Sequence, residues 1–185
     1  TYAVERSRVV SAPPERIADL SAHRLVLFRA PKGKAEWTLR DEATGKEFLL
    51  LNAHWDHISV PARQKSAQLI RDRLATLAPG LPAIVMGDFN AREDSSEVRA
   101  ILGGDDGQRE LIDSFRRVHP ERSAEEASYS DFLGTTKGSR IDYILVTPEW
   151  TPLAASIVRT SYDGLWPSDH YPITARLRLE SGAPR

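Results

Sequence analysis

Two polar residues that can bind a metal ion or a phosphate group follow a short apolar run near the middle of the chain. The run is Ala83–Met86. Gly87 ends it, and Asp88 and Asn90 follow, two positions apart in the sequence. In extended backbone, residues two apart face the same side of the strand. A carboxylate and a carboxamide supply the oxygen atoms that magnesium prefers, and the amide also donates N–H bonds to phosphate. This stretch alone equally favours a buried strand that ends in an Asx turn, because Asp and Asn are common in such turns.

Three further polar clusters flank or interrupt apolar segments that have the length of strands. They are His54 after Phe48–Leu51, Asp142 within Arg140–Val146, and Asp169 with His170 before Ile173–Leu179. A carboxylate inside an apolar strand needs a partner, because a buried charge without one is unfavourable. We therefore predict a hydrogen bond of at most about 3.2 Å between Asp142 and the ring of His170. Taken singly, His54 can be a satisfied core histidine, and the Ser-Asp-His turn can be a capped loop.

Together these residue types supply what hydrolysis of a phosphodiester needs. The reaction requires a cation on the phosphate, a base that aims a water molecule and a donor near the leaving oxygen. Asp169 is a candidate magnesium ligand, and Asp88 can accept the proton of the attacking water. His170 can donate to a phosphate oxygen while Asp142 fixes its tautomer. Asn90 can hold the water and the phosphate in place. His54 can donate to the phosphate or to the leaving group.

Four motifs occur in an order that resembles the endonuclease/exonuclease/phosphatase superfamily. These metal-dependent phosphoesterases include pancreatic-type deoxyribonucleases, abasic-site endonucleases and neutral sphingomyelinases. The motifs are Asn52-Ala53-His54-Trp55-Asp56-His57, Gly87-Asp88-Phe89-Asn90, Arg140-Ile141-Asp142-Tyr143 and Ser168-Asp169-His170. The resemblance covers Lys46–Leu179, the second half of a family domain. It implies part of a four-layer α/β/β/α sandwich, and a hydrolase that cleaves phosphodiester or phosphomonoester bonds by metal-assisted, in-line attack of water.

Carried over motif by motif, the resemblance implies three overlapping sets of site residues. The catalytic set is His54, Asp88, Asn90, Asp142 and His170. The metal ligands are Asp169, Asp88 and Asn90, for Mg²⁺ or alternatively Mn²⁺. The phosphate contacts are His54, Asn90 and His170. The resemblance leaves open how these residues divide the roles of general base and general acid.

The first half of a family domain normally adds an Asn and a Glu to the metal site, and neither has a match here. Glu5, Glu15 and Glu36 lack the surrounding pattern. We therefore expect residues 1–185 to be a single domain truncated on its N-terminal side, with the missing half as a partner. The alternative is a catalytically incomplete binding fragment. A serine hydrolase is a weaker option, because no Gly-x-Ser-x-Gly motif is present and Ser168 lies too close to His170.

Composition describes a soluble globular chain without a strong preference for one substrate. The chain has 185 residues, a net charge of -1 and no cysteine. Near-neutral charge argues against strong non-specific binding of duplex DNA, where Lys and Arg contacts to phosphate dominate. No apolar run is long enough for a transmembrane helix. Nucleic acid, phospholipid headgroup and small phosphodiester all stay open as substrates, and so does the compartment, because secreted proteins can also lack cysteine.

Local patterns predict the elements that would position these residues. A hairpin is expected from Trp37–Arg40 and Glu47–Leu51, and a helix from Pro61 to about Ala78, with apolar residues at helical spacing. Further expected elements are a strand remnant and loop in Thr1–Ala22, a strand at Leu25–Phe28, helices at Glu97–Leu102 and Glu110–Val118, and strands at Arg140–Val146, Ala154–Arg159 and Ile173–Leu179.

Other residues near the motifs have two interpretations each. The aromatic residues can stack on a base or a lipid headgroup, although core packing is their commoner role; they are Trp55, Tyr129, Phe132 and Trp166. Arg63 and Lys65 can reach a phosphate, although a solvated helix face is the favoured interpretation. His57 is interpreted as structural or as part of the rim of the site.

Overall fold

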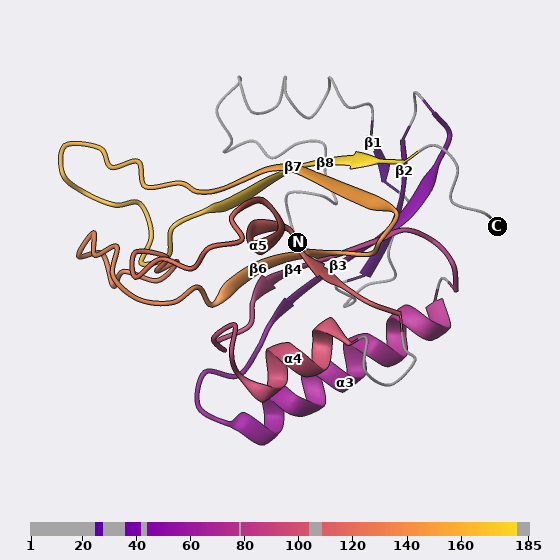
Figure 1. The fold of residues 1–185 in the computed structure, drawn as a ribbon, viewed down its shortest axis with the longest axis horizontal. Helices are drawn as coiled ribbons and strands as arrows, with labels where there is room; N and C mark the ends of the chain where they lie inside the picture. The colour runs from indigo at the N-terminus through magenta and orange to yellow at the C-terminus, as the bar shows by residue number, and fades with distance from the viewer. Residues whose placement is uncertain (1–24, 28–35, 42–43, 78, 104–108, 181–185) are drawn as a thin grey trace.

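The computed structural model describes residues 25–27, 36–41, 44–77, 79–103 and 109–180 (Figure 1). The strand remnant predicted in Thr1–Ala22 lies outside them, as do the side chains of Glu5 and Glu15. The strands are β1 (Leu25–Leu27), β2 (Glu36–Asp41), β3 (Glu47–His54), β4 (Ala83–Asp88), β5 (Ile112–Asp113), β6 (Asp142–Val146), β7 (Trp150–Ile157) and β8 (Ile173–Leu179). The helices are α3 (Val60–Leu77), α4 (Ser96–Leu102) and α5 (Ser114–Val118).

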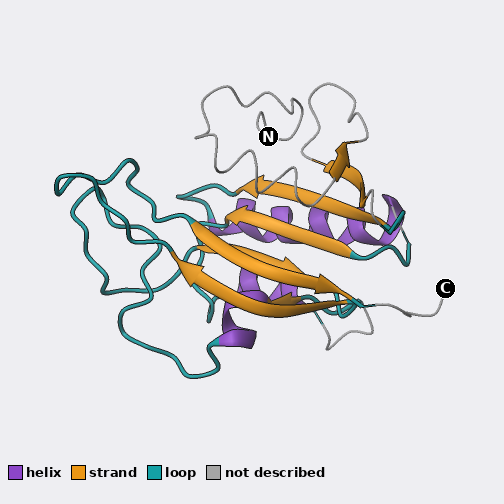
Figure 2. Ribbon diagram, turned by 90° about the horizontal axis from the view of Figure 1, so that it is seen from above, coloured by secondary structure: helices purple, strands orange, loops and turns teal. Residues whose placement is uncertain are grey.

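These elements form layers around a six-stranded sheet. The strand order is β1-β2-β3-β4-β6-β5; β3 and β4 run parallel, and the other pairs are antiparallel. The antiparallel pair β7–β8 covers one face of this sheet, and α3 with α4 covers the other (Figures 1 and 2). The fold is therefore of the mixed α/β class that the sequence predicted, with β, β and α layers as in the expected sandwich.

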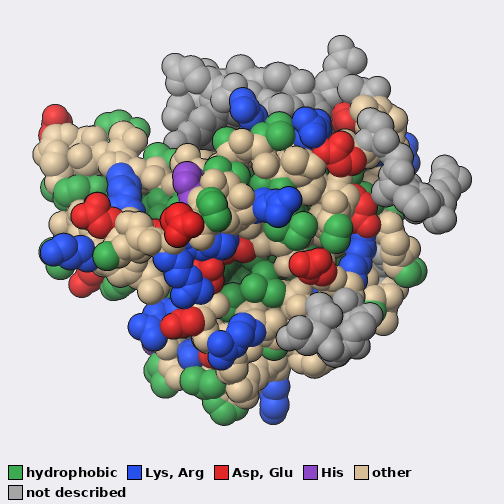
Figure 3. Space-filling view, in the orientation of Figure 1, with side chains coloured by type: hydrophobic (Ala, Val, Ile, Leu, Met, Phe, Trp, Pro, Cys, Tyr) green, Lys and Arg blue, Asp and Glu red, His purple; other side chains and the backbone are tan. Residues whose placement is uncertain are grey.

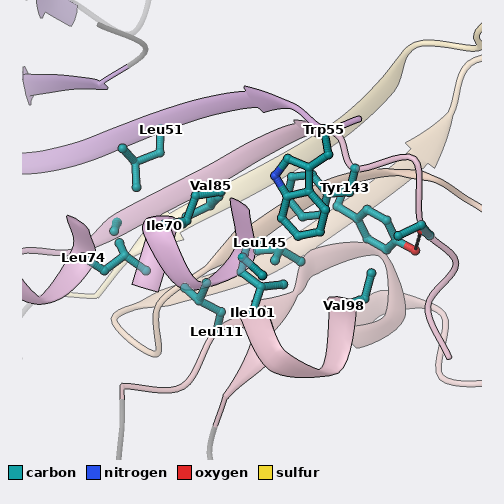
Figure 4. Close-up of a cluster of buried hydrophobic side chains, with 14 of the residues drawn as sticks. Leu51, Trp55, Ile70, Leu74, Val85, Val98, Ile101, Leu111, Tyr143 and Leu145 are labelled. Atoms are coloured by element: carbon teal, nitrogen blue, oxygen red, sulfur yellow. Dashed lines mark hydrogen bonds between the residues drawn. The ribbon is translucent and has the colours of Figure 1, made fainter. Parts of the chain in front are cut away.

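The central strands are apolar throughout because both of their faces are buried. On β3, Leu49 and Leu51 point to the helices, whereas Phe48 and Leu50 point to β7–β8. On the helix side, Figure 4 shows residues of the strands and of α3 and α4 meeting in one core, among them Leu51, Val85, Leu145, Ile70, Leu74, Val98 and Ile101. The alternation of β3 thus fills two cores, and it explains why this strand reads as a continuous apolar run.

Helix boundaries follow local capping, and two sequence predictions need correction. Ser95 caps α4 by accepting a bond from the Val98 amide, so this helix matches the prediction closely. The helix predicted at Glu110–Val118 begins only at Ser114, because Asp113 ends a short strand and caps α5. Leu69 is one of the apolar residues whose helical spacing predicted the buried face of α3, but it is 56% exposed. None of the helices in the described part of the chain is long and apolar enough to cross a membrane.

Candidate active site

Three of the predicted site residues lie side by side at one end of the sheet. His54 at the end of β3 pairs in register with Asp88 at the end of β4. Asp88 in turn pairs with Asp142 at the start of β6. Because β3 and β4 are parallel and β6 runs against them, two strand ends and one strand start meet at the same edge. The topology therefore brings together residues that lie up to 88 positions apart in the sequence.

A close approach of two strands requires glycine beside this row. Gly87 has φ +140°, and a Cβ atom there would lie 1.8 Å from the carbonyl oxygen of Ala53. No other residue fits that space without separating β3 from β4. Gly87 therefore sets how closely Asp88 approaches His54, whose Nε2 lies 3.4 Å from Asp88 Oδ2.

Asn90 orients the Asp88 carboxylate through two hydrogen bonds. The Asn90 backbone N–H donates to Asp88 Oδ1 at 2.8 Å, and its Nδ2 donates to Asp88 Oδ2 at 3.1 Å. Nδ2 also donates to the Trp55 carbonyl at 2.9 Å, and the backbone of Asn90 is left-handed, with φ 48°. The Asx turn considered from the sequence is therefore present. It uses both hydrogens of the amide, whereas Asn90 Oδ1 accepts no hydrogen bond from the described residues.

The predicted hydrogen bond between Asp142 and His170 is confirmed. His170 Nδ1 lies 2.9 Å from Asp142 Oδ2, and His170 Nε2 lies 3.8 Å from Asp88 Oδ2. Burial alone would lower the pKa of His170, but the bond to Asp142 and the nearby charges of Asp142, Asp88 and Asp169 outweigh burial and raise this pKa. The charged form of His170 is therefore stabilised relative to that of a free histidine, and Nε2 lies toward Asp88.

The segment 128–130, in which the sequence singled out only the aromatic Tyr129, holds the Asp169–His170 turn in place. Tyr129 and His170 form an isolated antiparallel bridge, and their rings meet edge to face at 5.1 Å. The Ser130 amide donates to the Asp169 carbonyl at 2.7 Å, and the Tyr171 amide donates to the Ser128 carbonyl at 2.7 Å. Residues 128–130 therefore tie the last motif to the rest of the site.

All six predicted site residues line one open cavity of about 720 Å³. They are His54, Asp88, Asn90, Asp142, Asp169 and His170. The cavity is also lined by Asn52, His57 and Ser168, which the sequence did not place among the site residues, and by Tyr129, for which it left stacking on a base or a lipid headgroup open. Spacing could have found Asn52, which lies two residues before His54 on the same strand. His57 lies at the rim, as the sequence suggested.

The oxygen and nitrogen atoms around the cavity include a group close enough to share a cation. One ligand atom each from Asp88, Asp142 and His170 lies within 4.8 Å of the others. Hydrogen bonds already engage all three residues, because His170 bonds Asp142 and Asn90 donates to Asp88. Asp169 accepts a bond from the Ser168 hydroxyl at 3.2 Å, and no other described group donates to its carboxylate. Asp169 and Asn90 Oδ1 are thus the oxygen donors least committed to the protein.

Two of the neighbouring residues have structural roles. Trp55 is 3% exposed and stacks on Phe89, so it belongs to the core. Arg63 was expected on a solvated helix face, but its Nε donates to the buried Glu97 at 2.9 Å, and its side chain is 11% exposed. Glu97 lies at the start of α4, 34 residues later in the sequence, so the pattern of α3 alone could not predict this partner.

Comparisons with known proteins agree with this geometry. A family profile described as the Endonuclease/Exonuclease/phosphatase family matches residues 6–170. A mannosyl-6-phosphatase of Bacteroides thetaiotaomicron VPI-5482 is 30% identical, with a TM-score of 0.69 over 78% of this chain and 56% of that chain. An endonuclease/exonuclease/phosphatase family protein from Bacteroides thetaiotaomicron is 29% identical, with a TM-score of 0.70 over 79% and 55% of the two chains.

A more distant structure shares the fold alone. The human nocturnin catalytic domain, solved with a bound sulfate anion, is 18% identical, with a TM-score of 0.63 over 85% of this chain and 61% of that chain. The chain thus spans little more than half the length of the bacterial structures that it matches. No curated protein matches the sequence at a significant level.

Proposed function

The chain belongs to the Endonuclease/Exonuclease/phosphatase family, and from that premise we propose that its cavity hydrolyses phosphoester bonds by attack of water on phosphorus. The observation that carries the proposal is the arrangement of Asp88, His54 and His170, because one carboxylate faces two imidazole rings at 3.4 and 3.8 Å. A phosphate placed against the two rings would have a proton acceptor beside it. Metal-assisted hydrolysis requires such groups together with a cation on the phosphate.

In this proposal Asp88 is the group that accepts the proton of the attacking water. Its two oxygens are held by the backbone and side-chain N–H groups of Asn90, so the carboxylate has a fixed direction. His170, held by Asp142, donates from Nε2 to a phosphate oxygen, which its raised pKa favours. His54 has a side chain that is 76% exposed and donates to the phosphate or the leaving group. The contacts of each side chain support these roles.

The donor atoms also fit a divalent cation of the magnesium or manganese type. Asp169 would hold the ion, with the Asn90 carbonyl oxygen and Asp88 contributing directly or through water. Hard oxygen donors suit Mg²⁺, which is usually bound by one or two carboxylates together with substrate phosphate. When bound, such an ion supplies Lewis-acid stabilisation of charge on the phosphate. The triad of Asp88, Asp142 and His170 suits it less well, because hydrogen bonds already engage its members.

The alternative function is a phosphate-binding domain that does not hydrolyse its ligand. It is favoured by the single uncommitted carboxylate at the described site, because magnesium held by one carboxylate binds weakly. A further carboxylate from elsewhere in the whole protein would restore the enzyme.

Substrate class also belongs to the proposal. The net charge is -1, and Figure 3 shows acidic and basic side chains interspersed on one face of the molecule; without a strong excess of positive charge, a small phosphoester is favoured over a long polyanion.

The test is an assay of the chain, and of a longer natural form of it, on several phosphoesters. Bis-p-nitrophenyl phosphate, a sugar 6-phosphate, single-stranded DNA and phospholipid vesicles are each tested with Mg²⁺, with Mn²⁺ and with EDTA. We expect hydrolysis of at least one small phosphoester that EDTA abolishes and that Asp88→Asn lowers. If both forms bind phosphate but hydrolyse none of the substrates, the binding alternative is correct. Hydrolysis that Asp88→Asn leaves unchanged would refute the proposed site.

A further inference from the structure

Ser128 is a buried serine whose hydroxyl contacts the strand that carries Asp142. Its side chain is 0% exposed, and its Oγ accepts bonds from the amides of Ile141 at 2.9 Å and Asp142 at 3.2 Å. Burial raises the pKa of the Asp142 carboxyl, and hydrogen bonding from His170 and Ser128 counters this rise. A serine hydroxyl has two lone pairs and one hydrogen, so when both lone pairs accept from the amides the hydrogen can still point to that carboxylate.

The backbone of the same residue holds the other partner of the pair. The Ser128 carbonyl accepts a bond from the Tyr171 amide at 2.7 Å, next to His170 in the sequence. The following residue, Tyr129, forms a backbone bridge with His170 itself. His170 precedes β8 and Asp142 begins β6, so these contacts of 128–130 lie between the two motifs. One residue therefore touches Asp142 through its side chain and the His170 segment through its main chain.

From this geometry we propose that Ser128 is a positioning residue, which sets the Asp142 carboxylate at hydrogen-bonding distance from His170 Nδ1. The inference rests on the proposed function for its catalytic meaning, because a misplaced Asp142 matters to turnover only if His170 contacts the phosphate. Without the hydroxyl, the amides of Ile141 and Asp142 lose their acceptor, and the carboxylate loses a donor that fixes its rotamer. The His170 ring then loses its orientation, although the residues that touch substrate stay unchanged.

The chain offers a matched control on the same strand. Thr147 follows the opposite end of β6, is 0% exposed, and its hydroxyl accepts the Ala83 amide at 2.8 Å. Thr147→Val removes a buried hydroxyl that bonds a backbone amide, as Ser128→Ala does, but away from the cavity. Both variants should lower stability to a similar degree. Only Ser128→Ala should change the geometry and the turnover of the site.

The first experiment needs no substrate. Crystal structures of the Ser128→Ala and Thr147→Val variants are compared at the Asp142–His170 pair. We expect the distance from His170 Nδ1 to Asp142 Oδ2 to exceed hydrogen-bonding range, about 3.5 Å, in Ser128→Ala only. A pair that keeps its 2.9 Å contact in Ser128→Ala would overturn the proposal. This result is independent of whether the chain hydrolyses phosphoesters, so it separates failure of this proposal from failure of the proposed function.

The second experiment measures turnover in a double-mutant cycle. Ser128→Ala should lower kcat by roughly 10- to 100-fold with little change in KM, which is the usual cost of losing a group that orients a catalytic ligand. Ser128→Thr, which keeps a hydroxyl, should restore most of kcat. In an Asp142→Asn background, Ser128→Ala should lower kcat by a much smaller factor, because both substitutions act through the same carboxylate. If Ser128→Ala lowers kcat by the same factor in the wild type and in the Asp142→Asn background, the role assigned to Ser128 is wrong.

Discussion

His170 Nε2 lies 3.8 Å from Asp88 Oδ2, whereas Nδ1 of the same ring bonds Asp142 at 2.9 Å. The longer distance exceeds that of a hydrogen bond, so the two side chains face each other without being bonded directly. A phosphate oxygen near Nε2 would accept a hydrogen bond from the ring, and a water molecule near Asp88 would give its proton to the carboxylate. The ring is thus fixed on one side and available on the other.

The first prediction concerns the fixed side of that ring. Asp142→Asn should lower turnover by on the order of a hundredfold or more, because the amide neither fixes the His170 tautomer nor balances its charge. Steady-state kinetics on the best substrate of the chain measures the effect. Asp72→Asn on the exposed face of α3 is the matched control and should leave kcat unchanged. Equal turnover in the wild type and in Asp142→Asn would rule out the assigned role.

The second prediction concerns the close approach of β3 and β4. Gly87→Ala places a Cβ atom against the Ala53 carbonyl and should lower the free energy of unfolding by on the order of 4 kcal/mol or prevent folding. Gly80→Ala is the control, because Gly80 also has a positive φ but open space around it. It should cost only the backbone strain, about 1–2 kcal/mol. Similar losses for both variants in urea unfolding would mean that the contact with Ala53 is relieved easily.

The sequence predicted that His54, Asp88 and Asp142 meet, because these residues lie at strand ends that simple patterns reveal. The apolar run Ala83–Met86, with Gly87 and Asp88 after it, marks where β4 ends. A buried carboxylate needs a partner, and this need pointed from Asp142 to His170. Neither argument depends on knowing the packing of distant segments. Both concern local periodicity or the energy of an unpaired charge.

What the sequence did not predict depends on contacts between distant loops. Ser128 lies in a polar stretch that reads as irregular, and nothing local distinguishes it from Ser123 or Ser130. Its role follows from the meeting of β6 with the segment before β8. Arg63 was likewise misjudged, because its partner Glu97 belongs to another helix. Helical spacing shows which face of a helix is apolar, but it does not show which basic side chain on the other face pairs with a buried acidic residue.

The third prediction concerns an ion-pair network behind the site. Arg116 bonds both Glu93 and Glu126, and Glu93 also pairs with Arg140 at 3.3 Å. Burial alone would raise the pKa of Glu93, but its bond to Arg116 and the charges of the arginines outweigh burial and lower this pKa below its ordinary value of 4.5. Glu126 is shifted in the same direction for similar reasons.

The sign of the pH effect follows from these shifts. The folded state binds fewer protons than the unfolded state, so the network stabilises the fold above about pH 4.5 and loses this contribution as the pH falls through the lowered pKa values. Glu93→Gln should lower the free energy of unfolding by about 2 kcal/mol near neutral pH and make it less sensitive to acid. Urea unfolding at several pH values measures both effects. Glu47→Gln, in the exposed pair with Arg40, should change stability by less than about 1 kcal/mol. An unchanged acid dependence in Glu93→Gln would contradict the prediction.

The fourth prediction concerns the proposed cation. Asp169 is the carboxylate of the cavity with the fewest bonds to described groups, so we expect it to be the main anionic ligand. Asp169→Asn should weaken binding of Mn²⁺ by at least about tenfold, because a neutral amide replaces the charge that attracts the ion. Isothermal titration calorimetry with Mn²⁺ measures this without a substrate, and EDTA should remove the bound ion reversibly.

Asp163→Asn is the matched control for that experiment. Asp163 is exposed in the same loop and has a left-handed backbone, with φ 52°, a conformation that Asn tolerates well. The substitution removes the same charge from the same loop without touching the cavity. We therefore expect its affinity for Mn²⁺ to match the wild type. If Asp163→Asn and Asp169→Asn weaken binding equally, the ion responds to the overall charge of the loop, and Asp169 is not its ligand. If neither changes binding, the cation is held elsewhere, and the triad of Asp88, Asp142 and His170 becomes the site to mutate next.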